Sequence, residues 1–282
     1  MAKTWVITGA SRGIGKSIVK SVLSVLSVGD NVVATGRSVD GLINAFGEEH
    51  SQLTFANLDV NDQDAAIRAV EIATERYGGI DVLVNNAGYG QLGHFETIRA
   101  EDIERQFETN VMGLMKVTRA VLPIMRKQKS GHIINLSSIG GAVGFEGASV
   151  YCATKFAVEG FSESLALEVN AFGIKVTIVE PGFFRTDFLD ASSVRYGTID
   201  IGDYASATKT QQTQYDQYSH AQPGDPEKLS ALIVGVGHAN SVPLRLIAGS
   251  DALEMSRASL QSRAAEMDAW AEKSITTDFE PA

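Results

Sequence analysis

Short runs of β-branched and aliphatic residues alternate along this chain with longer segments of helical periodicity. The segments between the runs, such as 62–78 and 100–128, are long enough for crossover helices. The runs are continuously apolar, which is typical of strands buried on both faces of a parallel sheet. The pattern therefore predicts a doubly wound α/β domain with a mostly or fully parallel seven-stranded sheet flanked by helices. The predicted strands are Thr4–Thr8, Asn31–Thr35, Leu53–Asn57, Asp81–Asn85, His132–Leu136, Lys175–Val179 and Leu244–Ala248.

Size and charge limit the class of protein. The chain has 282 residues, of which 44% are apolar, and α/β folds of this size form a single domain with a large core. We therefore expect one dinucleotide-binding and catalytic domain over residues 1–282. The formal net charge of −10 argues against a nucleic-acid partner, because nucleic acids bind basic surfaces.

The cysteine and histidine residues indicate a protein of a reducing compartment without a catalytic metal site. Cys152 is the only cysteine in the sequence, so no intrachain disulfide is possible, which suits a cytoplasmic protein. No run has a membrane-spanning apolar length, and Arg12 and Lys16 interrupt the apolar start that a signal peptide needs. The five histidines show no metal-ligand spacing, so no catalytic metal is expected.

A glycine-rich turn, TGASRGIG at residues 8–15, connects the first predicted strand to a helix. Glycines let the backbone turn sharply and let a phosphate approach the helix N-terminus, where the helix dipole favours an anion. The spacing differs from G-x-G-x-x-G, the general dinucleotide fingerprint, so a tight strand-to-helix connection is the alternative. In a Rossmann-type domain this turn would hold the cofactor pyrophosphate. Its candidate contacts are Gly9, Ser11, Arg12, Gly13, Ile14 and Gly15.

Tyr151 and Lys155 lie four positions apart in a segment of helical period, so they share one helical face. A tyrosine with its ordinary pKa of about 10 is a poor proton donor at neutral pH. A neighbouring ammonium favours the phenolate and is expected to lower that pKa. Taken alone, the pair favours a solvated helix face, because tyrosine and lysine at this spacing occur by chance on many helices.

The motifs together resemble the classical short-chain dehydrogenases/reductases (SDR). TGASRGIG is similar to that family's glycine signature, and Tyr151-x-x-x-Lys155 is similar to its active-site pattern. Ser138 precedes Tyr151 by thirteen positions, as in the family, and Asn110 falls where its helical asparagine sits. The resemblance covers about residues 3 to 190. Its other matching positions are Asn85, Asn86, Ala87 and Gly88 in the NNAG segment, Asp59 and Val60 at the adenine, and Pro181, Gly182 and Thr186 at the nicotinamide turn.

The resemblance implies a proton donor, a carbonyl-binding hydroxyl and a proton relay. In carbonyl reduction, Tyr151 would give a proton to the substrate oxygen and Ser138 would hold that oxygen. Lys155 would lower the pKa of Tyr151 and bind the nicotinamide ribose, while Asn110 would hold a water that resupplies the proton. Two alternatives stay open: Asn110 as a helix-bend or capping residue, and Ser137 in place of Ser138. Strand alternation and the thirteen-residue spacing favour Ser138.

The end of the second strand predicts which nicotinamide cofactor is used. Gly36 stands where an acid would bind an unphosphorylated ribose, and Arg37 follows it. The resemblance brings Arg12 close to the same place. Two guanidinium groups without a carboxylate suit a 2′-phosphate, so NADP(H) is expected to be preferred over NAD(H). The alternative is that both arginines are solvated loop charges.

A long polar segment with scattered aromatic residues, 183–223, follows the nicotinamide turn and is expected to form a lid over the substrate. In outline it resembles the hydroxysteroid/retinol-dehydrogenase-like branch, which implies a bulky apolar substrate. The alternative is that its aromatic residues pack the lid onto the domain. The candidate pocket residues are Tyr89, Val143, Phe145, Phe184 and Phe188; Tyr196 and Tyr204 are further wall candidates.

The remaining expectations concern assembly and function. A helical extension is predicted at about residues 250–275, outside the core or at a subunit contact. Family resemblance implies a homodimer or homotetramer. The expected function is NADPH-dependent interconversion of a carbonyl and an alcohol, as in a carbonyl reductase or alcohol dehydrogenase. The alternatives are a non-catalytic NADP-binding sensor or scaffold and a sugar-nucleotide-modifying relative.

Overall fold

The structure, a computed structural model, describes residues 2–24, 29–190 and 193–279. A sheet of seven strands forms its centre, and all neighbouring strands in this sheet are parallel. The predicted fold class is confirmed, and the ends of each predicted strand differ by at most two residues from those observed. In sheet order the strands are β3 (Leu53–Asn57), β2 (Asn31–Gly36), β1 (Thr4–Ile7), β4 (Val82–Asn85), β6 (Gly131–Leu136), β7 (Ile174–Pro181) and β9 (Arg245–Ala248).

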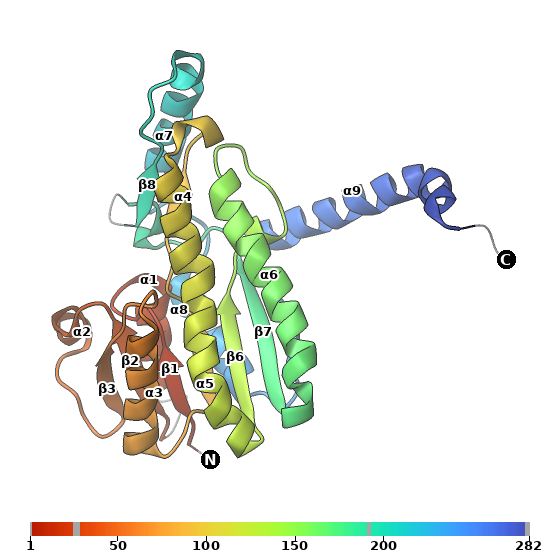
Figure 1. The fold of residues 1–282 in the computed structure, drawn as a ribbon. Helices are drawn as coiled ribbons and strands as arrows, with labels where there is room; N and C mark the ends of the chain where they lie inside the picture. The colour runs from red at the N-terminus through yellow and green to blue at the C-terminus, as the bar shows by residue number, and fades with distance from the viewer. Residues whose placement is uncertain (1, 25–28, 191–192, 280–282) are drawn as a thin grey trace.

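Helices cover both faces of this sheet (Figure 1). Trp5 and Ile7 of β1 pack with α1, α2 and α8 on one face, whereas Val6 packs with α3, α5 and α6 on the other. Successive strand residues therefore enter opposite cores, which explains the continuously apolar runs in the sequence. The helices of the first face are α1 (Gly13–Leu23), α2 (Val39–Phe46) and α8 (Pro226–His238), and those of the second are α3 (Gln63–Tyr77), α5 (Leu114–Gln128) and α6 (Ser149–Val169).

The topology opens a crevice beside β1. This strand pairs with β2 on one side and with β4 on the other, so the crossovers that follow β1 and β3 run to opposite halves of the sheet. In open α/β sheets such a reversal leaves a crevice at the carboxyl ends of the strands, where ligands bind. The glycine turn at residues 8–15 and the segment 86–89 after β4 both lie at this end.

A buried carboxylate joins β1 to the end of α8 at the amino ends of the strands, opposite the crevice. Asp30 Oδ1 accepts a hydrogen bond from the Lys3 backbone N–H at 2.8 Å. Its Oδ2 lies 2.9 Å from Trp5 Nε1, which donates to it, and 2.7 Å from His238 Nε2. Three donors from two elements therefore depend on one side chain that is only 2% exposed.

We expect Asp30→Ala to lower the free energy of unfolding by about 3 kcal/mol, because it leaves several buried donors without an acceptor. Urea unfolding followed by circular dichroism measures the change. Glu104→Ala removes an exposed carboxylate and is the control. Equal unfolding midpoints for the two variants would show that the Asp30 cluster does not stabilise the fold.

The predicted lid segment, 183–223, contains regular structure that the sequence analysis did not predict. It includes β8 (Val194–Tyr196) and α7 (Ala205–Tyr218). β8 pairs in parallel with β5 (Gly90–Leu92) to form a second, two-stranded sheet. Figure 1 shows β8 and α7 together beyond the carboxyl ends of the main strands. Strands of three residues are too short to produce a periodic signal in the sequence.

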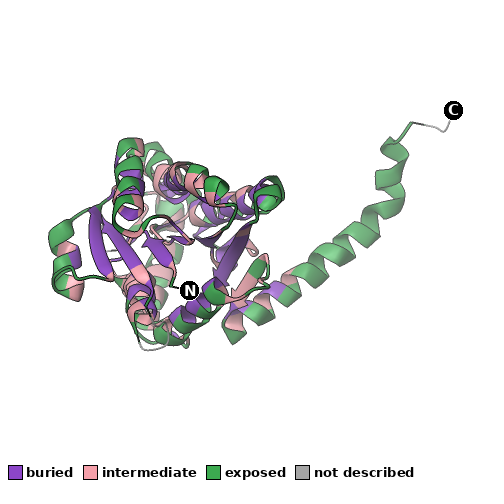
Figure 2. Ribbon diagram, turned by 90° about the horizontal axis from the view of Figure 1, so that it is seen from below, coloured by how far each residue is buried: buried purple, intermediate pink, exposed green. Residues whose placement is uncertain are grey.

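The last helix, α9 (Ser250–Ser274), leaves the body of the molecule (Figure 2). Its first half contacts the loop after β6, where Ser259 Oγ and Arg263 Nη2 donate to the Ala142 carbonyl at 3.1 and 2.9 Å. Beyond this contact the side chains are exposed, and Trp270 is 60% exposed. The helix predicted at 250–275 is thus present.

Candidate active site

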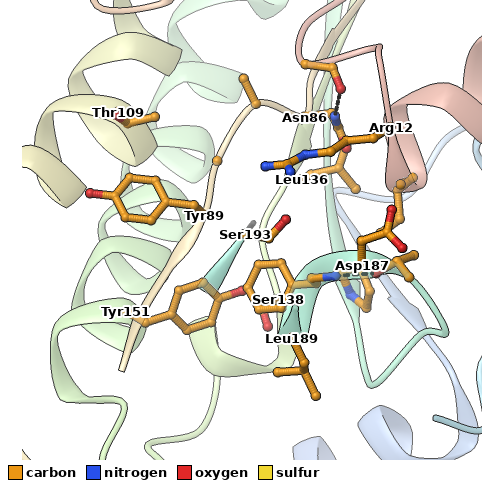
Figure 3. A pocket seen from close by; sticks show the side chains of 18 of the residues that line it. Arg12, Asn86, Tyr89, Thr109, Leu136, Ser138, Tyr151, Asp187, Leu189 and Ser193 are labelled. Carbon is orange, nitrogen blue, oxygen red and sulfur yellow. Dashed lines mark hydrogen bonds between the residues drawn. The ribbon is translucent and has the colours of Figure 1, made fainter. Parts of the chain in front are cut away.

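A cavity of about 410 Å³ lies at the carboxyl ends of the strands. It extends from the glycine turn and the end of β2 to the start of α6 and the segment after β7. In Figure 3, Arg12 and Asn86 lie toward one end, and Tyr151 and Ser138 lie toward the other. The cavity thus joins the predicted phosphate-binding residues to the predicted catalytic residues.

The backbone of the glycine turn, residues 8–15, has a shape that lets a phosphate come close to it. Gly9 and Gly13 have φ angles of 64° and 54°, which favour glycine over other residues. A Cβ on Gly15 would lie 2.5 Å from Asn86 Nδ2, so no larger residue fits there without displacement. Asn86 Nδ2 itself donates to the carbonyls of Thr8 and Gly9 at 2.9 and 3.1 Å, which fixes the turn. The N-terminus of α1 follows at Gly13 and offers free N–H groups to an anion.

Nearly all residues predicted to bind the cofactor lie on this cavity. Gly15 does not line it and packs behind Gly9 instead. The lining runs from the glycine turn and the end of β2 to Tyr151 and Lys155, and these residues fit a dinucleotide. The predicted residues on the lining are Gly9, Ser11, Arg12, Gly13, Ile14, Arg37, Asp59, Val60, Asn86, Ala87, Gly88, Tyr151, Lys155, Pro181, Gly182 and Thr186.

Tyr151 and Ser138 face each other in the cavity. Ser138 lies close enough to Tyr151 to oppose the effect of burial on the pKa of the phenol, and Ser138 Oγ accepts a hydrogen bond from the Gly140 N–H at 3.0 Å. The Tyr151 ring packs against Phe188 with ring centres 5.7 Å apart. Burial raises the pKa of Tyr151 to about 12, and this effect outweighs the opposing effect of Ser138. The lowered pKa expected from the sequence is therefore not found.

The position of Lys155 explains this difference. Its Nζ donates to the Leu136 carbonyl at 2.8 Å and lies 5.8 Å from the centre of the Tyr151 ring. The ammonium is thus held by the end of β6 rather than by the phenol oxygen. Burial lowers the pKa of Lys155 to about 8, whereas the Glu159 carboxylate acts in the opposite direction. A buried amine of this kind loses its proton far more readily than an exposed lysine.

Asn110 lies behind the cavity rather than on its lining. It sits in a π-helical turn, Glu108–Gly113, between α4 (Ala100–Phe107) and α5, within the segment 100–128 that the sequence predicted to be long enough for a crossover helix. Its Nδ2 donates to the Tyr89 carbonyl at 2.9 Å and to Thr154 Oγ1 at 3.2 Å, and its Oδ1 accepts from the Tyr89 N–H. Both ends of the amide are therefore engaged by local groups. These contacts favour the helix-bend alternative for its side chain, and the water relay stays a prediction.

Ser137 and Ser138 have separate surroundings, although both line the cavity. Ser138 and Tyr151 both lie beside Gly140, whereas Ser137 and Glu159 lie beside Gly141. A Cβ on Gly141 would lie 2.6 Å from Ser137 Oγ and 3.2 Å from Glu159 Oε1. Of the two serines, Ser138 is the one that the structure pairs with the tyrosine.

The predicted substrate wall is present in part, since four of its seven candidate residues line the cavity. Tyr89, Phe145, Phe184 and Phe188 line the cavity, whereas Val143 does not. Val143 donates its N–H to the Ile139 carbonyl and continues the turn after Ser138. After Ile139, the next residue in the chain that lines the cavity is Phe145. Tyr196 and Tyr204 are likewise absent from the lining; the Tyr204 hydroxyl donates to Glu96 at 2.6 Å.

Several lining residues were missed by the sequence analysis. Most of them come from β5, β8, α4 and the segments around them, whose approach to Tyr151 depends on tertiary structure that no local pattern signals. Two of them are arginines, and the Arg195 guanidinium lies 6.0 Å from the Tyr89 ring centre. The missed residues are Leu58, Asn61, Leu92, Arg105, Thr109, Leu136, Ile139, Ala148, Phe183, Asp187, Leu189, Ser193, Arg195, Tyr215 and Gln222.

The segment 183–223 is tied down over the cavity by aromatic and polar contacts. Phe183 packs edge-to-face on Tyr218 of α7 at 5.3 Å and on Phe145 at 6.3 Å between ring centres. Gln211 of α7 donates to the Glu146 carbonyl at 2.8 Å. The sequence left open whether the aromatic residues line the substrate pocket or pack the segment onto the domain. Phe183 and Phe145 do both, since they line the cavity and contact each other across the segment boundary.

Three potential metal ligands meet at the edge of this segment. Asp187, Asp190 and His220 have ligand atoms within 4.8 Å of one another. Asp190 Oδ1 lies 3.1 Å from His220 Nε2 and accepts a bond from Ser219 at 2.9 Å. Asp190, near the start of segment 183–223, thus contacts Ser219 and His220 near its end.

The fold and the cavity define a dinucleotide-binding α/β protein with a Tyr-x-x-x-Lys site. The family model for short chain dehydrogenase matches residues 3–197. Oxidoreductase BOA17 of Botryotinia fuckeliana is 39% identical over 98% of this chain and 100% of that protein. The 3-ketodihydrosphingosine reductase of Bacteroides thetaiotaomicron is 37% identical over 86% of each chain.

Solved structures agree with this match. A short-chain dehydrogenase from Streptomyces avermitilis superposes with a TM-score of 0.87 at 39% identity, covering 99% of this chain and 100% of that one. ElxO with NADP bound superposes with a TM-score of 0.71 at 25% identity, covering 88% and 97%. The chain therefore belongs to the classical short-chain dehydrogenases/reductases, a family of oxidoreductases. Among its described helices, none has the length and apolar character needed to span a bilayer.

Proposed function

We propose that this protein is an NADPH-dependent oxidoreductase that interconverts a carbonyl and an alcohol. The observation that carries the proposal is the pairing of Ser138 with Tyr151 in the same cavity as the glycine turn. A bound reduced nicotinamide would supply the hydride. Consumption of NADPH with a panel of carbonyl compounds, measured for this chain and for Tyr151→Phe, tests the proposal.

The protein residues supply the proton and hold the oxygen. Because the pKa of Tyr151 is raised to about 12, its phenol is protonated at neutral pH and is ready to donate. Ser138, already within bonding reach of that phenol, donates a hydrogen bond to the carbonyl oxygen as negative charge develops there. Lys155 binds the nicotinamide ribose and places a positive charge near the phenolate that remains after proton transfer. Reduction is the direction that these protonation states favour.

This assignment predicts a pH dependence. The pKa of Lys155 is lowered to about 8, so its ammonium is present below that pH and is lost as the pH rises through it. Tyr151 stays protonated over the same range and adds no loss of its own. We expect kcat/KM for carbonyl reduction to be level below about pH 7.5 and to fall above about pH 8 with a single titration. Initial rates between about pH 6 and 10 measure this; a level profile throughout would show that the Lys155 charge is not needed.

The preference for NADP(H) over NAD(H) is also part of the proposal. Arg12, Gly36 and Arg37 line the same end of the cavity, and no acid ends β2. Two guanidinium groups at that end suit a 2′-phosphate, which accepts paired hydrogen bonds from arginine. The NADP-bound structure of ElxO supports this choice.

The substrate is proposed to be a bulky, mainly apolar ketone or aldehyde. Phe145, Phe183 and Phe188 surround the Tyr151 end of the cavity, and α7 with its flanking segment acts as the lid. The similarity to a 3-ketodihydrosphingosine reductase supports a ketone with a long apolar part. A substrate of the hydroxysteroid or retinol type, as the sequence resemblance implies, fits the same description.

A homodimer or homotetramer in the cytoplasm completes the proposal. The outer faces of the π-helical turn and α6 carry exposed apolar side chains, among them Met112, Phe156 and Leu167, the last 80% exposed. Apolar residues on adjoining helix surfaces support a subunit contact there. The acidic net charge of −10 supports the absence of a nucleic-acid partner.

A further inference from the structure

A cluster of charged residues lies behind Lys155, on the side away from the cavity. Glu159 follows Lys155 by four residues on α6, and its side chain is buried. Its Oε2 accepts a hydrogen bond at 3.1 Å from Nε of Arg245, which belongs to β9. The same guanidinium donates from Nη2 to exposed Glu163 at 2.7 Å. One half-exposed arginine thus reaches from the surface to a buried carboxylate beside the active-site lysine.

A second buried carboxyl group completes the cluster. Glu180 of β7 is only 2% exposed, and its Oε1 lies 3.7 Å from Arg245 Nε. Burial raises the pKa of Glu180 to about 7, and the negative charge of Glu159 raises it further. The pKa of Glu159 is also raised by burial, but Ser137, Arg245 and Lys155 oppose this effect. Of the two buried carboxyl groups, Glu159 is the one that accepts a hydrogen bond from the Arg245 guanidinium, whereas Glu180 Oε1 lies 3.7 Å from the same nitrogen.

The active site depends on the charge of Glu159 because Lys155 is itself buried. Its ammonium hydrogen-bonds to the Leu136 carbonyl, a neutral acceptor, at 2.8 Å. Burial works against its charge, and Glu159 is the group that works for it. The cluster also adjoins the catalytic turn, since Gly141 leaves room for Ser137 Oγ and Glu159 Oε1 side by side.

We infer that Glu159 is a positioning residue whose carboxylate keeps the Lys155 ammonium charged beside Tyr151, and that Arg245 and Glu180 hold this carboxylate in place. The catalytic consequence rests on the proposed function, whereas the coupling between Glu159 and Lys155 does not. No proton passes through the cluster in this account; its effect on the reaction is electrostatic.

The test is an NMR titration of the Lys155 Nζ signal in lysine-labelled full-length protein, assigned with Lys155→Arg. We expect Glu159→Gln to lower the pKa of Lys155 by about 1 unit, because it removes the opposite charge that raises this pKa. Glu159→Asp retains the charge and is expected to retain most of that pKa. Glu163→Gln removes an exposed carboxylate from the same arginine and is the matched control, with no change expected.

The same variants give a kinetic readout that a purely structural role would not move. In Glu159→Gln, the alkaline fall of kcat/KM shifts to lower pH by the same amount as the Lys155 titration. If the wild type and Glu159→Gln titrate Lys155 at the same pH, the inference is wrong. If the expected shift occurs but no carbonyl is reduced by the wild type, the inference holds and the proposed function fails.

A second variant covers the case in which Glu159→Gln does not fold. Arg245→Gln removes the guanidinium that contacts Glu159 and Glu180, at a half-exposed position of β9. Both buried carboxyl groups stay in the chain. Without the guanidinium the pKa of Glu159 rises, so its carboxylate takes up a proton more readily. The pKa of Lys155 is then expected to fall, as it does in Glu159→Gln. An unchanged Lys155 titration in Arg245→Gln would overturn the role given to the Arg245 guanidinium.

Discussion

Tyr151→Phe is expected to lower kcat/KM for carbonyl reduction by about 10²–10⁴-fold, the range that a positioned proton donor contributes. The substitution removes one oxygen and keeps the ring that packs against Phe188. NADPH binding should therefore be nearly unchanged, so that the loss falls on turnover. Initial rates of NADPH oxidation, together with NADPH titrations of protein fluorescence, separate the two effects.

The matched control for this experiment is Tyr215→Phe. Tyr215 also lines the cavity, and burial also raises its pKa, but Ser138 acts on the pKa of Tyr151 and not on that of Tyr215. We expect little change in turnover from this variant. Wild-type rates in Tyr151→Phe, or equal losses in both variants, would contradict the assignment of Tyr151 as the proton donor.

Arg37→Asp is expected to reverse the preference between NADPH and NADH. The arginine offers charge-assisted hydrogen bonds to a 2′-phosphate, each contributing about 1.5–3 kcal/mol, whereas an aspartate repels it and accepts from a ribose 2′-hydroxyl. The ratio of kcat/KM for NADPH to that for NADH should fall by at least about 100-fold, because about 1.4 kcal/mol corresponds to a factor of ten. Rates with each cofactor at a fixed carbonyl concentration give the ratio.

Arg68→Asp controls for the change in net charge. Arg68 lies on α3, is mostly exposed and pairs with Asp62 at 3.4 Å, away from the cavity lining. Its substitution changes the total charge by the same amount and is expected to leave the cofactor ratio unchanged. The same ratio in Arg37→Asp as in the wild type would rule out the proposed 2′-phosphate site.

The main sheet could be predicted from the sequence because each strand is buried on both faces. Runs such as Asn31–Thr35 carry that signal without any long-range information. β5 and β8 have three residues each and exist only because the segments 86–92 and 193–197 meet in space. The sequence offered the bend at Asn110, between α4 and α5, only as an alternative, because its contacts with Tyr89 and Thr154 join residues far apart in sequence.

The residue types of the site could be predicted, but their electrostatics could not. The spacing of Ser138, Tyr151 and Lys155 placed them in one cavity as expected. The direction of the Tyr151 pKa was wrong, because it depends on complete burial and on the ammonium turning toward Leu136. Val143 was placed in the substrate wall by its position in a loop, whereas the turn after Ser138 keeps it off the lining.

The most direct test of the central claim is deuterium transfer from NADPH labelled at the nicotinamide C4 position. Each carbonyl of the panel is incubated with the protein and the labelled cofactor, and the products are analysed by mass spectrometry. We predict an alcohol that carries one deuterium on the former carbonyl carbon, formed by the wild type and not by Tyr151→Phe. Tight NADPH binding without deuterium in any product would contradict this account and favour a non-catalytic NADP-binding sensor or scaffold.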